Sequence, residues 1–426
     1  MKVALVAMDE RNAFLLEQLE REGHEVCLLS RNYTGAWEGL VPRSKGFREV
    51  VEWGPDVAIV DSPGLGSAAK ALTDSGIPTL GGGKLMDKIN DNYLFGMSFL
   101  SAAQVRTSEF ERFTDAADAA EYVHGKSRPW LFRNSDGTCR CCRDDVDLQF
   151  YMESLIQAGK MPAEFAVQLG FPEHLDKELM LRPQSYWCGL YNSTGLMNPC
   201  LRLDVAHNLL PAGQGVPTVE GVNLRPVAIG EASVLRQLEK PLRAINYTGW
   251  VFVGCVRDWD ERTGESVECA VDIKTQPPDG FWAAILRGLT MSFANFLDRA
   301  ANPKRPNAPF EFWPGHTASR KLSLPPYPLT EAPWLSDAQR QDLGRNLLPP
   351  TRFRREPWGV YWSEVWQPPE DRGYLHARGV NLGYVVGRGT SHIEAVEEAM
   401  RVTANLPIQF AQVRVEDGLA EFNLCI

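Results

Sequence analysis

The sequence lacks the features that would mark a membrane or nucleic-acid-binding protein. No apolar run reaches the roughly 18 residues that a membrane-spanning helix needs, and no dense tract of lysine and arginine occurs. The net charge is -10, so binding to nucleic acid through a basic face is not expected. The opening MKVALVAM is short and runs into Asp9-Glu10-Arg11, so we do not expect a signal peptide.

Cysteine occurs in no pattern typical of a disulfide framework or a zinc site. The chain has 9 cysteines in 426 residues, an odd number that fits reduced thiols in a cytoplasmic compartment. Cys139, Cys141 and Cys142 are close in sequence, but their spacing is not that of a zinc pair and no histidine is near. No Ser-His-Asp arrangement is evident. We therefore expect a cytoplasmic protein without a zinc centre.

The first hundred residues alternate short apolar runs with amphipathic segments. Strands are expected at Lys2–Met8, Glu25–Ser30, Asp56–Asp61 and Ile77–Leu80. This strand-helix rhythm predicts a parallel sheet covered on both faces. Ligands of such sheets lie at the carboxyl ends of the strands. The candidate ligand-binding segments are therefore Met8–Asn12, Asp61–Gly66 and Gly81–Lys84.

A mixed block of helices and strands follows, and then a less regular region. Long helices are expected at Leu85–Ala103 and Phe281–Ala300. From Asn302 to Pro368 the chain is rich in proline and tryptophan. Ser391 and Glu394 fit a capping box for a final helix, and Asp417-Gly418 predicts a terminal hairpin.

One hairpin, Trp250–Gly280, carries the most informative polar pattern. Its second strand places Asp272, Lys274 and Gln276 at every other position, so these side chains share one face of the strand. A phosphate and metal site would explain an acid, a base and an amide in a row. A solvated outer face of the sheet would explain them equally well.

The other candidate binding and catalytic residues also have a purely structural explanation. Arg133 ends an apolar strand and could grip a phosphate or simply lie at the surface. The glycines of Gly81–Lys84 could cradle a phosphate or form a plain turn, because the strict P-loop spacing is missing. His207 could act as a general base or be a structural, hydrogen-bonded histidine.

The order of these pieces resembles glycinamide ribonucleotide synthetase (phosphoribosylamine–glycine ligase), a family of ATP-grasp enzymes, over nearly the whole chain. The resemblance is carried by Pro55–Leu100, by WLFRNSDG at Trp130–Gly137, by GQGVPTVEG at Gly213–Gly221, by VDIKTQPPDG at Val271–Gly280, and by the C-terminal NLGYVVGRGTSHIEAVEEAM. It implies an α/β and α+β multidomain fold with three parts. These are an N-terminal parallel-sheet domain at 1–103, a central ATP-grasp domain of two subdomains at 104–315, and a small C-terminal α+β domain at 316–426.

The resemblance also implies a function. The implied function is that of an ATP-dependent carboxylate–amine ligase, which forms an amide through an acyl phosphate. Its cofactors would be ATP and Mg²⁺, and its substrates a small-molecule carboxylate and an amine. The protein would be a monomer or a homodimer. The implied catalytic residues are Arg133 and Lys274. The implied ATP-binding residues are Lys84, Lys88, Arg133, Gln168 and Lys274. The substrate would lie at Gly213, Gly215, Thr218 and Gly221, and the metal at Asp272, Glu268 and Asp279.

The sequence departs from the family pattern at several of these positions. Tyr93 stands where the family has its first ATP lysine, and Lys274 stands in the metal-binding pair. The N-terminal Gly-Gly-Arg-Glu-His stretch is absent, which predicts an altered substrate. These departures leave two alternatives to the ligase open. One is a catalytically degenerate ATP-grasp-like protein kept as a nucleotide-binding or interaction module. The other is a different chemistry on the same fold.

Overall fold

The computed structural model describes most of the chain. The described residues are 1–135, 139–169, 185–207, 219–260, 265–302, 308–328, 330, 335–336, 338–340, 342–343, 348, 351–354, 359–408 and 411–413. The C-terminal hairpin expected at Asp417-Gly418 lies outside them. Among the described residues, no helix is long and apolar enough to cross a membrane.

The N-terminal region is a parallel sheet in the order β2-β1-β3-β4. Its strands are β1 (Lys2–Ala7), β2 (Glu25–Ser30), β3 (Val57–Val60) and β4 (Thr79–Leu80). Helices cover it, namely α1 (Phe14–Arg21), α2 (Phe47–Trp53) and α3 (Gly66–Asp74). Every residue of β3 is buried, as expected for a strand covered on both faces. The predicted parallel sheet is confirmed.

Two helices leave this region where one was expected. The chain forms α4 (Lys84–Asp91) and α5 (Tyr93–Ala102), with a break at Asn92. Asn92 has an extended backbone, and its side chain accepts a hydrogen bond from the backbone N–H of Phe95 at 2.9 Å. An asparagine that caps a new helix in this way competes with continuation of the old one. The break places Tyr93 at the first position of α5.

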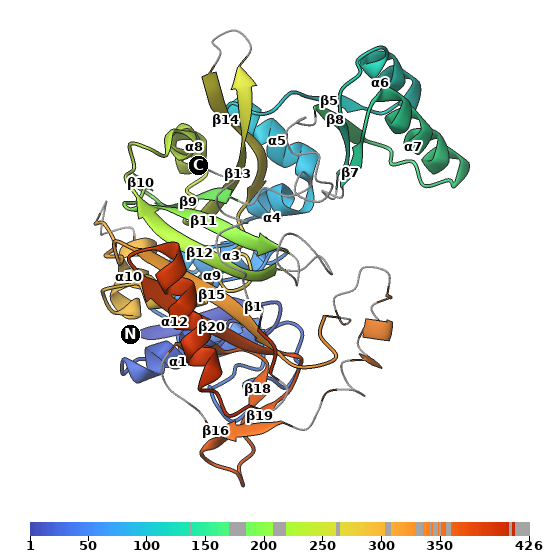
Figure 1. Ribbon diagram of the computed structural model, residues 1–426. Coiled ribbons are helices and arrows are strands. Elements are labelled where there is room, and N and C mark those ends of the chain that lie inside the picture. The colour runs from blue at the N-terminus through green and yellow to red at the C-terminus, as the bar shows by residue number, and fades with distance from the viewer. Residues whose placement is uncertain are drawn as a thin grey trace.

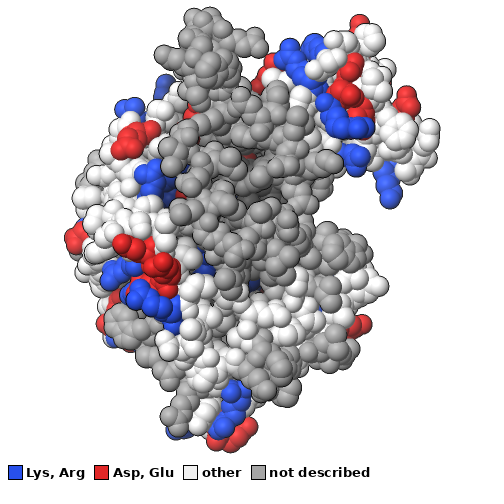
Figure 2. All heavy atoms as spheres, in the orientation of Figure 1, with Lys and Arg blue, Asp and Glu red and all other residues white. Residues whose placement is uncertain are grey.

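A small lobe then projects from the molecule (Figure 1). It is an antiparallel sheet in the order β5-β8-β6-β7, covered by two helices. Its elements are β5 (Phe110–Phe113), α6 (Ala116–Val123), β6 (Trp130–Asn134), β7 (Cys139–Cys142), α7 (Asp145–Gln157) and β8 (Phe165–Leu169). Phe132 and Phe165 stack in its core with ring centroids 4.9 Å apart. Figure 2 shows an open notch between this lobe and the part of the molecule below it.

The largest unit is an antiparallel sheet that runs β14-β13-β9-β11-β12-β15-β20-β17, with β10 beside β9. Its strands are β9 (Ser185–Asn192), β10 (Gly195–Leu196), β11 (Cys200–His207), β12 (Val219–Val227), β13 (Gly249–Asp260), β14 (Glu265–Lys274), β15 (His316–Ser323), β17 (Val360–Trp362) and β20 (Asn381–Gly389). β15 pairs directly with β12. The boundary proposed between residues 315 and 316 therefore falls inside one continuous sheet.

Four helices and a small sheet complete this unit. The helices are α8 (Ser233–Ala244), α9 (Phe281–Gly288), α10 (Phe293–Ala301) and α12 (His392–Ala404). The small sheet is β16-β19-β18, formed by β16 (Arg352–Arg354), β18 (Val365–Trp366) and β19 (Tyr374–Ala377). The single helix expected at Phe281–Ala300 is split into α9 and α10. The cause is again a cap, because the Ser292 hydroxyl accepts from the backbone N–H of Asn295.

Candidate functional site

β6 delivers Arg133 to the junction between the lobe and β14. The side chain is 5% exposed, and its guanidinium carbon lies 4.9 Å from the ring centroid of Tyr93. Its Nε donates to Oε1 of Gln168 at 3.0 Å. The backbone N–H of Tyr93 donates to the carbonyl of Ser135 at 2.6 Å, which ties the start of α5 to the end of β6. This tie holds the Tyr93 ring beside the guanidinium.

Gln168 on β8 is fully buried at the centre of this junction. Its Oε1 lies 3.1 Å from the hydroxyl of Tyr93, and its Nε2 donates to the Ser108 hydroxyl. The Tyr93 hydroxyl is also 3.1 Å from the carbonyl oxygen of Val271 on β14. Burial raises the pKa of Tyr93 above its ordinary value, so the phenol stays neutral and can donate. A neutral aromatic side chain thus fills the position where the resemblance implied a lysine.

β14 brings Asp272 and Lys274 to the same junction. β14 has a β-bulge at Val271, because the adjacent residues Gly254 and Cys255 of β13 pair with Asp272 and Ala270. Asp272 and Lys274 lie on one side of the strand, and Lys274 Nζ is 3.8 Å from Asp272 Oδ1. Asp272 acts electrostatically on Tyr93 and on Arg133. Arg133, Gln168, Asp272 and Lys274 therefore lie at one junction, whereas Gln276 lies exposed beyond the strand end.

The structure does not gather the three carboxylates predicted to hold magnesium. Glu268 accepts from Trp187 Nε1 at 2.6 Å and forms an ion pair with Arg202 at 2.9 Å. Asp279 lies in a different cluster, described below. Among the described residues, no group of three or more His, Cys, Asp or Glu side chains is placed to hold a metal ion. Only Asp272 of the predicted set lies at the junction.

The two lysines predicted to bind ATP lie on the exposed face of α4. Lys84 and Lys88 are both exposed, and Lys88 Nζ is 4.1 Å from the ring centroid of Phe95. The glycines before them serve packing, because a Cβ at Gly81 would lie 2.3 Å from the carbonyl oxygen of Val60. The phosphate-cradle interpretation of this turn therefore gains no support from its geometry.

The predicted substrate loop is described only at its end. Gly213, Gly215 and Thr218 lie outside the described residues. Gly221 belongs to β12, where a Cβ would meet the carbonyl oxygen of Ser319 on the neighbouring β15 at 2.2 Å. Its glycine is thus required by strand packing, and the expectation that it lines a loop is corrected. For His207 only the backbone, at the end of β11, is described.

A second polar site lies at the carboxyl ends of β1 and β3. We call it the interdomain cluster, and it comprises Asp9, Arg11, Asp61, Asp279, Lys321 and Glu364. Arg11 Nη1 is 3.6 Å from Asp279, and Lys321 Nζ is 3.4 Å from the same carboxylate. Lys321 is 1% exposed, whereas Asp279 is 31% exposed. Residues from the N-terminal sheet, from the turn before α9 and from β15 thus meet at one carboxylate.

The carboxyl groups of this cluster differ in their titration. Burial raises the pKa of Asp61 to about 6, although Asn12 and Trp282 both donate hydrogen bonds to it at 2.5 Å. Burial likewise raises the pKa of Glu364 to about 7. For Asp279 the opposing effect of burial is overcome by Lys321 and Arg11, which lower its pKa. Carboxyl groups with such divergent pKa values in one site are typical of acid–base chemistry.

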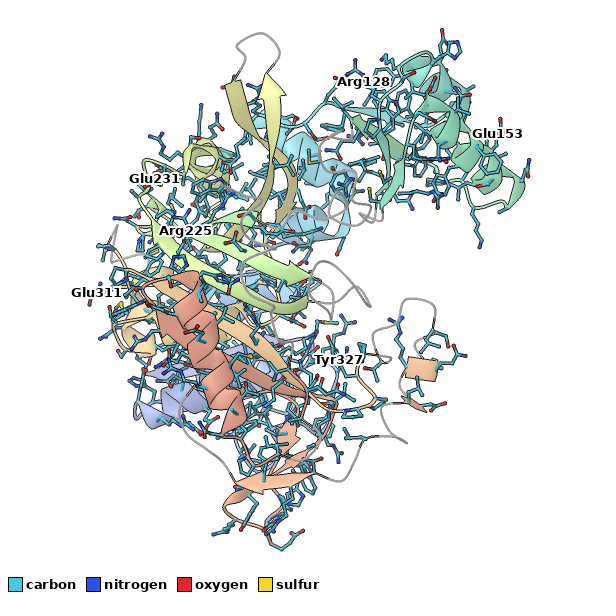
Figure 3. The ribbon with its side chains drawn as sticks, viewed as in Figure 1. Arg128, Glu153, Arg225, Glu231, Glu311 and Tyr327 are labelled. Carbon is cyan, nitrogen blue, oxygen red and sulfur yellow. The ribbon has the colours of Figure 1, made fainter. Side chains whose placement is uncertain are left out.

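Only part of the interdomain cluster could be predicted from the sequence. Asp9, Arg11 and Asp61 lie in the segments Met8–Asn12 and Asp61–Gly66, which were candidates because they follow the carboxyl ends of parallel strands. Lys321 and Glu364 are not part of any local sequence motif. They lie at the site because β15, β20 and β17 pair over a long distance in the sequence. Tyr327, labelled in Figure 3, lies beside Lys321, whose Nζ is 5.2 Å from its ring centroid.

Glu364→Gln should stabilise the protein in a pH-dependent way. A carboxyl group whose pKa is raised on folding costs stability as the pH rises from its unfolded value of 4.5 toward about 7. Removing the charge should therefore raise the free energy of unfolding by about 3 kcal/mol at pH 8 and change it little at pH 4. Urea denaturation at both pH values measures this, with exposed Glu370→Gln as the control. An equal effect at pH 4 and pH 8 would refute the assignment.

Comparison with known proteins identifies the fold. No protein-family model matches the sequence, and no curated protein matches it either. Among solved structures, a phosphoribosylamine–glycine ligase from Thermotoga maritima aligns with a TM-score of 0.69 and 12% identity, covering 97% of this chain and 99% of that one. The biotin carboxylase domain of a 2-oxoglutarate carboxylase from Hydrogenobacter thermophilus aligns with a TM-score of 0.61 and 11% identity, covering 96% and 91%.

A third solved structure has the same arrangement. The N5-carboxyaminoimidazole ribonucleotide synthetase from Thermotoga maritima aligns with a TM-score of 0.55 and 12% identity, covering 97% of this chain and 99% of that one. These similarities extend over nearly the whole of each protein, at identities that inform on fold alone. The expected multidomain architecture is confirmed, and this chain has the ATP-grasp fold.

Proposed function

We propose that the protein is an ATP-dependent carboxylate–amine ligase that forms an amide through an acyl phosphate. The observation that carries the proposal is the convergence of Arg133, Gln168 and Lys274 where the lobe meets β14. The fold is shared with the Hydrogenobacter biotin carboxylase domain, which was crystallised with MgADP, ADP and bicarbonate. Proteins of one fold can differ in function, so the residues of the site have to support the chemistry.

The residues at the junction fit a nucleotide. Arg133 offers a buried guanidinium, and guanidinium groups bind phosphate oxygens with paired donors. Lys274 is 34% exposed, so a ligand can reach it. Gln168 fixes the orientation of Arg133, because its Oε1 accepts from Arg133 Nε and from the Tyr93 hydroxyl. Mg²⁺ fits less well, because Asp272 is the only carboxylate of the predicted set at the junction and is already paired with Lys274.

The proposed reaction has two steps, to which the protein contributes charge and positioning. In the first, a carboxylate oxygen of the substrate attacks the terminal phosphorus of ATP, and ADP leaves. Arg133 and Lys274 would balance the negative charge on the transferred phosphoryl group. In the second, the amine nitrogen attacks the acyl carbon, and inorganic phosphate leaves with the former carboxylate oxygen. A base must take the proton that the amine loses.

The interdomain cluster is our candidate for the acceptor side of the reaction. Arg11, whose side chain is 41% exposed, could anchor an anionic group of the substrate. Glu364 has a pKa of about 7, which suits a group that takes up and releases a proton near neutral pH. Its location at the carboxyl ends of β1 and β3 agrees with the usual position of ligands on such sheets.

Hydroxylamine provides the test, because it replaces the unknown amine and traps acyl phosphates as hydroxamates. The protein, ATP and Mg²⁺ are incubated with hydroxylamine and a panel of small carboxylic acids, and ADP and hydroxamate are measured. The proposal predicts that at least one acid gives both products in equal amounts. Release of AMP and pyrophosphate would contradict the acyl phosphate.

The second candidate function is a nucleotide-binding module without catalysis. It is favoured by Tyr93, whose neutral, buried side chain takes the position of a phosphate-binding lysine and hydrogen-bonds within the site. In the same experiment this function predicts that ATP binds but that no acid yields ADP or hydroxamate.

A further inference from the structure

Each carboxylate predicted to bind magnesium has a cationic partner. Glu268 pairs with Arg202 at 2.9 Å. Asp279 pairs with Arg11 at 3.6 Å and with Lys321 at 3.4 Å. Asp272, which faces the nucleotide junction, pairs with Lys274 at 3.8 Å. The site thus supplies positive charge at the places where a metal-dependent enzyme would supply bare carboxylates.

A divalent cation is disfavoured beside Asp272 for an electrostatic reason. Magnesium is usually held by one or two carboxylates together with phosphate oxygens. Here an ammonium group already neutralises the one carboxylate, and it would repel a metal ion in contact with the same oxygen atoms. Arg133 acts electrostatically on Asp272 as well. The donor set therefore does not fit a metal ion without displacement of Lys274.

Lys274 is well placed to serve as the cation itself. Asp272 and Lys274 are two residues apart in the regular part of β14 that follows the bulge at Val271, so they lie on one side of the strand. The strand end is fixed to α4, because Asn90 donates to the Thr275 hydroxyl at 2.8 Å and accepts from the Thr275 N–H at 2.9 Å. The ammonium group is held near Asp272 and remains partly accessible. Such fixed charges stabilise phosphate without the reorganisation that water requires.

We propose that Lys274 replaces a divalent cation at this site, so that nucleotide phosphates bind between Lys274 and Arg133 without metal. This inference rests on the proposed nucleotide site. It assigns to Lys274 the phosphate-neutralising role that a metal ion would otherwise have.

Titration calorimetry with ATP and the full-length protein tests the inference, once in excess EDTA and once in millimolar Mg²⁺. The dissociation constants should agree within about threefold, a difference of well under 1.4 kcal/mol. Binding that is tenfold or more tighter with Mg²⁺ would overturn this inference and leave the proposed function intact. No binding under either condition would overturn both.

A charge-removing variant gives the second arm of the test. Lys274→Met should weaken ATP binding in EDTA by about 10- to 100-fold, as expected for loss of a hydrogen bond between charged groups. Mg²⁺ should then restore part of the affinity, because Asp272 no longer has its ammonium partner. Lys274→Arg should stay metal-independent.

Lys70→Met serves as the control for loss of a positive charge elsewhere, because Lys70 is an exposed residue of α3 paired with Asp74. It should bind ATP like the wild type. Thermal melting checks that each variant is folded. Wild-type affinity of folded Lys274→Met in EDTA would contradict the proposal.

Discussion

Arg133→Met is expected to abolish measurable ATP binding while the protein stays folded. A guanidinium can donate two charge-assisted hydrogen bonds to phosphate, and each is worth about 1.5–3 kcal/mol. Loss of both should weaken binding by 100-fold or more, since about 1.4 kcal/mol corresponds to a factor of ten. Some stability should be lost, because Gln168 Oε1 loses the Arg133 donor, although Tyr93 still donates to the same atom. Calorimetry and thermal melting measure the two effects separately.

Arg133→Lys is the matched control for this prediction. It keeps the charge but removes the planar, two-donor fork of the guanidinium. It also removes the Nε that donates to Gln168. Its affinity for ATP should therefore lie between those of the wild type and Arg133→Met. If Arg133→Met is folded and binds ATP like the wild type, the nucleotide site is elsewhere in the molecule.

Asp279→Asn is expected to be the most destabilising substitution among the charged residues described here. Asp279 compensates Arg11 and the buried Lys321, and its removal leaves both cations without this carboxylate. Breaking a buried ion pair costs about 3–5 kcal/mol. Because Asp279 is 31% exposed, we expect roughly 2–4 kcal/mol in urea denaturation at pH 7.

The pH dependence of this loss provides an internal check. The pKa of Asp279 is lowered on folding, so its contribution is present above the unfolded pKa and disappears as the pH falls through the folded value. The difference between wild type and Asp279→Asn should therefore shrink below pH 3.8, the ordinary value for an aspartate. Asp74→Asn is the control, because Asp74 forms only an exposed surface ion pair and should matter little. A pH-independent difference would contradict the ion-pair explanation.

The fold could largely be predicted from the sequence because its elements carry local signals. The parallel N-terminal sheet follows from alternating apolar runs, and the β13–β14 hairpin from two strands around a polar turn. The helix boundaries at Asn92 and Ser292 were missed for a physical reason. A capping hydrogen bond starts each new helix, and before Ser292 the backbone of Leu289 and Thr290 pairs with Phe312 and Glu311 instead of continuing α9.

The candidate sites could be predicted only in part, because side-chain partners come from distant strands. Arg133, Asp272 and Lys274 stand out locally, each at the end of an apolar strand. The assembly of the large sheet brings Arg202 to Glu268 and Lys321 to Asp279. Charge pairing across a fold has no sequence periodicity, so the predicted magnesium ligands looked available when each had a cationic partner.

A crystal structure with a non-hydrolysable ATP analogue would show directly whether a nucleotide binds at the junction. We predict electron density for the nucleotide between β6 and β14, with the phosphates within hydrogen-bonding distance of Arg133 and Lys274. Density for the nucleotide at another place, or none at saturating ligand, would contradict the nucleotide site and the ligase proposal with it.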